Sequence, residues 1–145
     1  GISKGEVGIS ERNRKFMLDV YTDDHQWIAD EPSSVGGNNA GPDPYEHLLA
    51  SVGTCTAMTI RMYAARKKWP LDNVDVTLRH SREHLKDCEG CEDKPMQIDV
   101  IDRDIVLHGD LDEDQRARLM AIADKCPVHR TLTHNLSITT REVSA

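Results

Sequence analysis

The chain has 145 residues and a formal net charge of −7 at pH 7, with a pI near 5.4. We expect one domain over residues 1–145, because this length is sufficient for a real core. The negative charge disfavours nucleic acid and anionic membranes as main partners. No apolar run approaches the roughly 20 residues that cross a bilayer.

Four cysteines occur, at positions 55, 88, 91 and 126. So few cysteines, in a chain without a recognisable secretory signal, do not resemble a disulfide scaffold. They favour the cytoplasm and either redox or metal chemistry, although inert packing is the usual role of each thiol.

The N-terminal part predicts a β-hairpin followed by a loop. Residues 16–21 alternate loosely between apolar and polar, residues 22–25 supply turn residues, and residues 26–29 continue the pattern. Residues 30–43 are rich in glycine and proline. Their Gly36-Gly37 pair lacks the following Lys-Ser/Thr of a phosphate-binding loop.

A long helix is predicted from Pro44 to Arg66. Asp43 can cap it, proline fits its first position, and Glu46 falls three residues after the cap, as in a capping box. Pro70 ends it. Apolar residues leave few polar positions along this segment, so we expect a helix that is buried on most faces.

The remaining elements complete an α+β chain with a mostly antiparallel sheet. Residues 74–80 and 97–107 alternate with period two and predict a pair of antiparallel strands. A second helix is expected from about Asp112 to Lys125. A last alternating strand is expected over residues 136–143. Regular strand–helix–strand alternation is absent, which favours α+β.

Cys55 lies in the middle of the long predicted helix. A helical cysteine is usually a small buried hydrophobe, but Ser51, Thr54 and Thr56 make its neighbourhood polar. Three turns into a helix, a thiolate gains little from the dipole, so a reactive Cys55 needs a nearby cation. The candidate cations are Arg12, Arg14, His47 and Arg130.

Glu46 is explained locally by the capping box. Nine residues at about 100° each place it opposite Cys55 on a straight helix. The two can share a site only if the helix bends near Gly53 or Glu46 lies in a curved first turn.

Cys126 directly precedes Pro127 at a predicted helix start, where backbone N–H groups stabilise a thiolate. His129 and Arg130 add cationic character nearby. On local physics alone, Cys126 is the better nucleophile of the two, and a serine-like cap is the structural alternative.

Cys88 and Cys91 form a Cys-x-x-Cys pair, which is half of a zinc site. Other ligands would have to be His80, His84 or groups of a partner chain. The acidic residues around the pair raise the thiol pKa values, which argues against a nucleophile. A disulfide and a regulatory pair are further alternatives, but spectator thiols are the favoured interpretation.

Two motifs resemble the OsmC/Ohr family of thiol-dependent organic hydroperoxide reductases. The first is Gly-Pro-Asp-Pro-Tyr-Glu-His-Leu-Leu-Ala-Ser-Val-Gly-Thr-Cys-Thr at residues 41–56, and the second is Cys-Pro-Val-His-Arg-Thr-Leu at residues 126–132. The order of elements is also similar, so the resemblance covers nearly the whole chain. It is closer to the generic OsmC-like proteins than to the best-characterised peroxidases.

The resemblance implies an intertwined cytoplasmic homodimer that needs no cofactor and reduces organic hydroperoxides in oxidative stress defence. It implies that Cys55 is the peroxidatic cysteine, that Cys126 is the resolving cysteine, and that Glu46 orients a catalytic arginine. For that arginine we choose Arg12 over Arg14, although the expected glycine-rich turn is missing there. An external thiol would then reduce the disulfide.

An apolar pocket built by Leu48, Met58 and Met62 would favour alkyl or lipid hydroperoxides. The alternative from another class is a non-catalytic OsmC-like protein that binds a small apolar ligand at its interface and senses redox state. A metal-binding protein centred on Cys88 and Cys91 is a third hypothesis.

Overall fold

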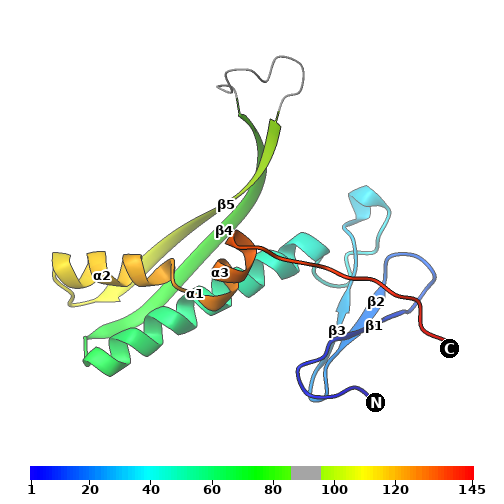
Figure 1. Ribbon diagram of the computed structural model, residues 1–145, viewed down its shortest axis with the longest axis horizontal. Coiled ribbons are helices and arrows are strands. Elements are labelled where there is room, and N and C mark those ends of the chain that lie inside the picture. Colours follow the sequence, from blue (N-terminus) through cyan, green and yellow to red (C-terminus); the bar gives the residue numbers. More distant parts are fainter. Residues whose placement is uncertain (86–95) are drawn as a thin grey trace. The chain divides into compact units, whose positions relative to one another are not determined.

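The computed structural model describes residues 1–85 and 96–145 and divides the chain into two compact units, residues 1–48 and 49–145. Each unit is described by itself below (Figure 1). The expectation of one domain over 1–145 stays a prediction. None of the helices in these ranges combines the length and apolarity needed to span a membrane.

The N-terminal unit contains a three-stranded antiparallel sheet. Its strands are β1 (Gly8–Glu11), β2 (Leu18–Tyr21) and β3 (Gln26–Ala29), in the order β1-β2-β3. The β2–β3 hairpin confirms the sequence prediction. Strand β1 was not predicted, because its four residues are too few to show a period. Ile9 of β1 pairs with Val20, which is buried in the middle strand.

Asp30 organises the loop that follows β3 and contains the short 3-10 helix η1 (Ser33–Val35). Its buried carboxylate accepts the backbone N–H groups of Glu31, Asn38 and Ala40 at 2.8, 3.0 and 3.1 Å. Burial raises the pKa of Asp30, but these three hydrogen bonds lower it by more, so the pKa lies below its usual value. The charged form of Asp30 therefore stabilises the folded loop.

Helix α1 (Pro44–Lys67) confirms the predicted long helix. The N–H of Glu46 donates to the Asp43 carboxylate at 2.8 Å, and the N–H of Asp43 donates to the Glu46 carboxylate at 3.0 Å, which completes the capping box. Within a single chain the burial is confined to one face of the helix. Met58 and Met62 are 68% and 72% exposed.

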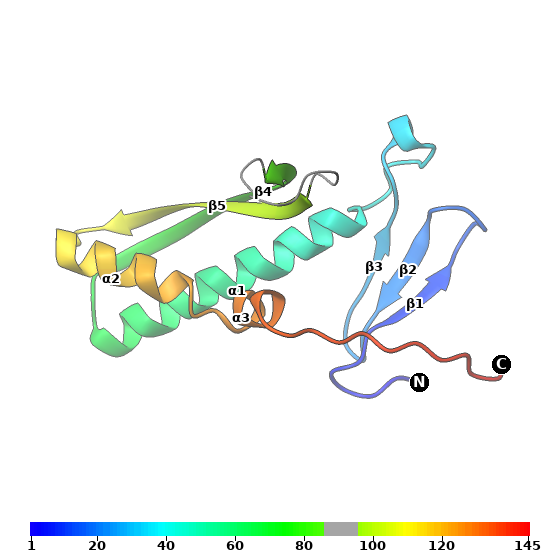
Figure 2. The ribbon, with the colours of Figure 1, turned by 45° about the horizontal axis from the view of Figure 1, so that its top comes forward.

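In the C-terminal unit, β4 (Leu71–Leu85) and β5 (Met96–Gly109) form the predicted antiparallel pair. Helix α2 (Glu113–Ala123) follows, capped by Asp112 in a second capping box. Figure 2 shows α1 and α2 on the same face of the β4–β5 hairpin. Their apolar side chains form the core with inward residues of the strands: Ile60, Ala64, Leu71, Leu107, Leu111, Leu119 and Ala123.

Gly53 lets α1 approach β4 closely. The helix is continuous through this position, so the glycine does not break it. A Cβ atom at residue 53 would lie 2.6 Å from Cδ1 of Leu78, which is far inside van der Waals contact. The glycine therefore serves packing, and it lies two residues before Cys55.

Helix α3 (Pro127–Thr133) is capped by Cys126 and begins with a proline, as predicted for this segment. The predicted last strand at residues 136–143 is wrong for the single chain, because the structure has no strand there. A strand needs a neighbour for its backbone hydrogen bonds, and no described strand pairs with it. Leu136, Ile138 and Val143 are 54%, 84% and 73% exposed.

Asp30→Asn tests the loop anchor, because it removes the charge while keeping the side-chain size. The folded-state pKa of Asp30 lies below its unfolded value, so its stabilising contribution is present at neutral pH and is lost as the pH falls through the folded-state pKa. We expect a lower melting temperature for Asp30→Asn at neutral pH and a difference that narrows in acid. Thermal denaturation at a series of pH values measures both.

The matched control is Asp23→Asn in the exposed β2–β3 turn, which should melt like the parent chain. Equal melting temperatures of Asp30→Asn and the parent chain at neutral pH would contradict the anchoring role.

Candidate two-cysteine site

The structure brings Cys55 and Cys126 together, although 71 positions separate their numbers in the chain. Both are free thiols, and their side chains are in hydrogen-bond contact. Cys55 is on α1 and is partly buried, whereas Cys126 caps α3 and has no exposed surface. Two thiols in contact can form a disulfide with little movement of the backbone.

Cys126 lies where its negative charge is stabilised. Burial raises the pKa of the Cys126 thiol, while the N–H of His129, the side chains of Cys55 and Thr56 and the N–H of Val128 lower it. The net result is a pKa below the ordinary value. The N–H of His129 donates to the sulfur at 3.3 Å. The serine-like cap predicted for Cys126 is therefore present, and the same hydrogen bonds favour the thiolate form.

Arg103 of β5 is a residue of this site that the sequence analysis missed. It donates to the hydroxyl oxygen of Thr56 at 2.9 Å, to the carboxylate of Asp124 at 2.9 Å and to Nδ1 of His129 at 3.3 Å. Its side chain is only 12% exposed. One guanidinium thus links the middle of α1, the end of α2 and the first turn of α3.

A signal for Arg103 is present in the sequence of β5. Ile101, Ile105 and Leu107 occupy alternate positions and are buried or partly buried, and Arg103 stands in the same row. Alternate residues of a strand share one face, so this charge lies at a core-facing position. A buried charge needs partners, and those partners form the site.

Arg12 and Glu46 belong to the N-terminal unit, whereas both described cysteines belong to the C-terminal unit. Arg12 forms an ion pair with Asp19 at 3.6 Å, with half of its side chain exposed. Glu46 is engaged in the capping box. Arg14 has a left-handed backbone with φ of 56°. The catalytic roles expected of Arg12 and Glu46 stay predictions.

His47 is occupied by structural hydrogen bonds. Its Nε2 atom accepts from Nε1 of Trp27 at 2.8 Å, and its Nδ1 atom lies 2.7 Å from the carbonyl oxygen of Asp43. An imidazole with hydrogen on Nδ1 satisfies both contacts. The role of His47 as a cation for Cys55 stays a prediction. Arg130 is exposed on α3.

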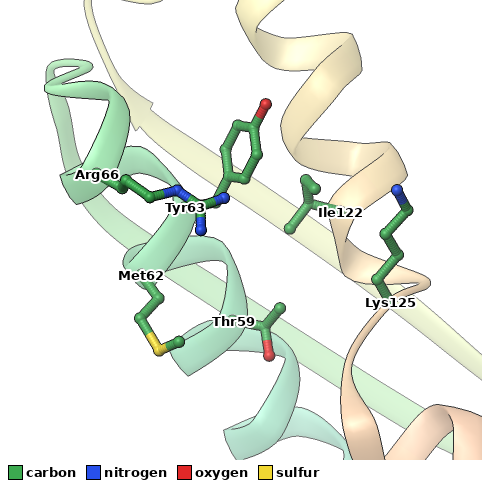
Figure 3. A pocket seen from close by; sticks show the side chains of 6 residues that line it. All are labelled: Thr59, Met62, Tyr63, Arg66, Ile122 and Lys125. Atoms are coloured by element: carbon green, nitrogen blue, oxygen red, sulfur yellow. The ribbon is translucent and has the colours of Figure 1, made fainter.

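A cleft of about 380 Å³ lies between α1 and α2 (Figure 3). Thr59 lines it one helical turn beyond Cys55, and Lys125 lines it directly before Cys126 in sequence. The other lining residues are Met62, Tyr63, Arg66 and Ile122. Of the expected pocket residues, Met62 lines this cleft, Met58 is exposed on α1, and Leu48 belongs to the N-terminal unit.

Cys88 and Cys91 lie outside the described residues, so the hypothesis of a zinc site at this pair stays a prediction. Within residues 1–85 and 96–145, no group of three or more His, Cys, Asp or Glu side chains could hold a metal ion.

Comparison with known proteins finds that the family of OsmC-like proteins matches residues 36–141. The structure is similar to an organic hydroperoxide resistance protein OsmC from Legionella pneumophila (TM-score 0.63, 19% identity, 93% of this chain and 94% of that chain). It is also similar to an OsmC-like protein from Mycoplasma pneumoniae (TM-score 0.64, 16% identity, 90% of this chain and 87% of that chain). A third similar structure is an organic hydroperoxide resistance protein from Elizabethkingia anophelis (TM-score 0.62, 15% identity, 92% of this chain and 92% of that chain). At these identities the likeness shows the fold, which is α+β as predicted, and no curated protein sequence matches the chain.

The contact between the two thiols predicts rapid formation of a disulfide by diamide, an oxidant that is not a peroxide. We expect a Cys55–Cys126 bridge within one chain, because the two thiol side chains already interact. Peptide mapping under non-reducing conditions identifies the bridge.

The matched control moves the thiol along α1, as Cys55→Ser combined with Met58→Cys. Residue 58 is 68% exposed, so its thiol is more accessible yet should form no bridge to Cys126. Equal bridging from both positions would contradict a preformed site.

Proposed function

Because the chain belongs to the family of OsmC-like proteins, we propose that it is a thiol-dependent peroxidase that reduces organic hydroperoxides. Cys55 is the peroxidatic cysteine and Cys126 the resolving cysteine in this proposal. The observation that carries it is the contact between the two thiols, far apart in sequence and both free. Two relatives of the same fold are named organic hydroperoxide resistance proteins, which supports the substrate class.

Accessibility supports this assignment of roles. A hydroperoxide must reach the sulfur that attacks it, and Cys55 is partly exposed whereas Cys126 has no exposed surface. Hydrogen bonds lower the pKa of the buried Cys126 thiol, and a thiolate stabilised in this way is a weak base. The proton of the attacking Cys55 thiol therefore goes to water, and Cys126 keeps its thiolate for the resolving step.

In the first step, the Cys55 thiolate attacks the outer oxygen of R–O–O–H. The S–O bond forms as the O–O bond breaks, which oxidises Cys55 to a sulfenic acid and reduces the peroxide to an alkoxide. The alkoxide takes a proton from water and leaves as the alcohol. The sulfur of Cys126 then displaces the hydroxyl group of the sulfenic acid, and water is released as the disulfide forms. An external thiol reduces that disulfide by exchange.

Arg12 and Glu46 complete the proposal as the arginine that activates Cys55 and the carboxylate that orients it. The role of Glu46 comes from the match of residues 41–56 to the family motif, and Arg12 is our choice over Arg14 for the N-terminal arginine that the resemblance implies. A guanidinium favours the thiolate and the developing alkoxide by charge.

The cleft between α1 and α2 is the proposed site for the organic part of the hydroperoxide. Its wall includes Met62, Ile122 and the ring of Tyr63, which suit an alkyl chain. Arg66 and Lys125 at the same cleft suit an anionic end group of such a chain.

The proposal includes a homodimer in the cytoplasm, with hydroperoxide and an external thiol as its other partners. In the single chain, one face of α1 leaves Met58 and Met62 exposed, and Ile138 of the C-terminal segment is 84% exposed. A second copy would cover such apolar surface, and the alternating segment at residues 136–143 would gain a neighbour for its backbone groups.

The alternative function is a non-catalytic protein that binds an apolar ligand and senses redox state through the same thiols. The observation that favours it is the cleft between α1 and α2, which could hold a ligand without any reaction. Two of its lining residues, Thr59 and Lys125, are close in sequence to the two cysteines. Turnover of a hydroperoxide separates the two functions.

The peroxidase proposal predicts steady-state reduction of cumene hydroperoxide with a small dithiol as reductant. Cys55→Ser should lower the rate about 10³-fold or more, because it removes the nucleophile. Cys126→Ser should retain one turnover and accumulate a sulfenic acid at Cys55, detected by dimedone labelling and mass spectrometry.

Cys88→Ser is the matched control and should keep the parent rate. Activity that survives in Cys55→Ser would overturn the assignment of the nucleophile. Ligand binding without turnover in the fully reduced parent chain would favour the alternative function.

The proposed homodimer predicts a sedimentation mass twice that of the chain. Met58→Glu should shift the population towards monomers, because a charge would be buried in the apolar contact. Lys4→Gln makes the same change in net charge at an exposed position and should remain dimeric. Analytical ultracentrifugation measures the masses, and a monomeric parent chain at micromolar concentration would contradict the dimer.

A further inference from the structure

Arg103 is a charged side chain of the C-terminal unit that makes three hydrogen bonds and that the proposed reaction does not use. Its side chain is 12% exposed, and its guanidinium donates to Thr56, Asp124 and His129. Asp124 is 71% exposed, so water screens that ion pair and it contributes little. The two better-shielded contacts, to Thr56 and His129, point towards Cys126.

We propose that Arg103 is a positioning residue of the two-cysteine site, because it holds the residue whose backbone N–H donates to the sulfur of Cys126 and the Thr56 hydroxyl that can turn to the same sulfur. The contribution of Arg103 to the resolving step rests on the proposed peroxidase function. Its effect on the pKa of the Cys126 thiol is independent of that function.

The first link runs through the hydroxyl of Thr56. Arg103 donates to the hydroxyl oxygen at 2.9 Å, so this oxygen serves as the acceptor on that side. The single hydroxyl proton then points either to the carbonyl oxygen of Val52, at 2.7 Å, or to Cys126. A negative charge on the sulfur favours the second direction, because charge-assisted hydrogen bonds are the stronger ones.

The second link runs through the backbone of α3. Arg103 holds the ring of His129 by donating to its Nδ1 atom, and the N–H of the same residue donates to Cys126. A ring held at one end fixes the first turn of a helix of only seven residues. The arginine thus keeps the backbone donor aimed at the sulfur.

The titratable and charged groups that meet at this network are Cys55 from α1, Arg103 from β5, Asp124 after α2 and His129 from α3. Of these, Arg103 is a permanent cation. Because it acts through Thr56 and His129 rather than by touching the sulfur, exchange for lysine should not preserve its effect: one ammonium group cannot reproduce the planar fork.

The test uses a chain in which Cys126 is the only thiol, made by Cys55→Ser, Cys88→Ser and Cys91→Ser. The titration of its thiolate, followed by ultraviolet absorbance, gives a midpoint. We expect Arg103→Met to raise that midpoint by about 1 pH unit and Arg103→Lys to raise it nearly as much, since a charge-assisted network is lost. The control is Arg79→Met, an exposed arginine of β4 paired with Asp104, which should leave the midpoint unchanged.

Thr56→Val and Thr56→Ser test the relay with Arg103 in place. Valine should raise the midpoint and serine should keep it. An unchanged midpoint in folded Arg103→Met would overturn the proposal. If that variant does not fold, equal midpoints for the valine and serine variants would overturn it.

In the chain with all four cysteines, Arg103→Met should slow disulfide formation after one equivalent of hydroperoxide about 10-fold at neutral pH. The deficit should shrink as the pH rises above the shifted midpoint, which a purely structural role would not produce. If no variant and no parent chain reacts with hydroperoxide, the proposed function fails while the titration still decides the role of Arg103.

Discussion

The proposed chemistry of the C-terminal unit depends on one interaction, which is the contact between the thiols of Cys55 and Cys126. One sulfur lies in the middle of a 24-residue helix and the other at the start of a 7-residue helix, so neither element alone could bring them together. The β4–β5 hairpin provides the common support, since its inward face carries the core shared by α1 and α2. The absence of a side chain at Gly53, two residues from Cys55, allows α1 to pack closely against Leu78 of β4.

A charged residue in the inward row of β5 would ordinarily destabilise such a unit. Here the guanidinium of Arg103 has a hydroxyl, a carboxylate and an imidazole as partners, so its donors are largely satisfied. The same fold therefore combines an aliphatic core at one end of the hairpin with a polar, hydrogen-bonded junction of helices at the middle. The cysteines lie at that junction, where burial and hydrogen bonds act on the sulfur in opposite directions.

Much of the fold could be predicted from local signals. The capping box of α1 and the Asp112 cap of α2 predicted where these helices begin, and period-two patterns located β2 through β5. The failures have physical causes: β1 is too short to show its period, and residues 136–143 have a strand-like pattern without a strand to pair with. Of the site, Cys126 was recognised from its position before Pro127, but its proximity to Cys55 came from the family resemblance. Arg103 was missed because a single charge in an alternating strand does not disturb the period-two pattern that predicts the strand.

The cap of α3 has one further consequence. The sulfur of Cys126 accepts the N–H of His129, and an anionic acceptor holds such a donor more strongly than a neutral one. In a disulfide the sulfur carries no charge, so oxidation would weaken this one hydrogen bond while tying the cap of α3 covalently to α1. A helix of seven residues has little intrinsic stability of its own, so its attachment would pass from a hydrogen bond in the reduced chain to a covalent bond in the oxidised one.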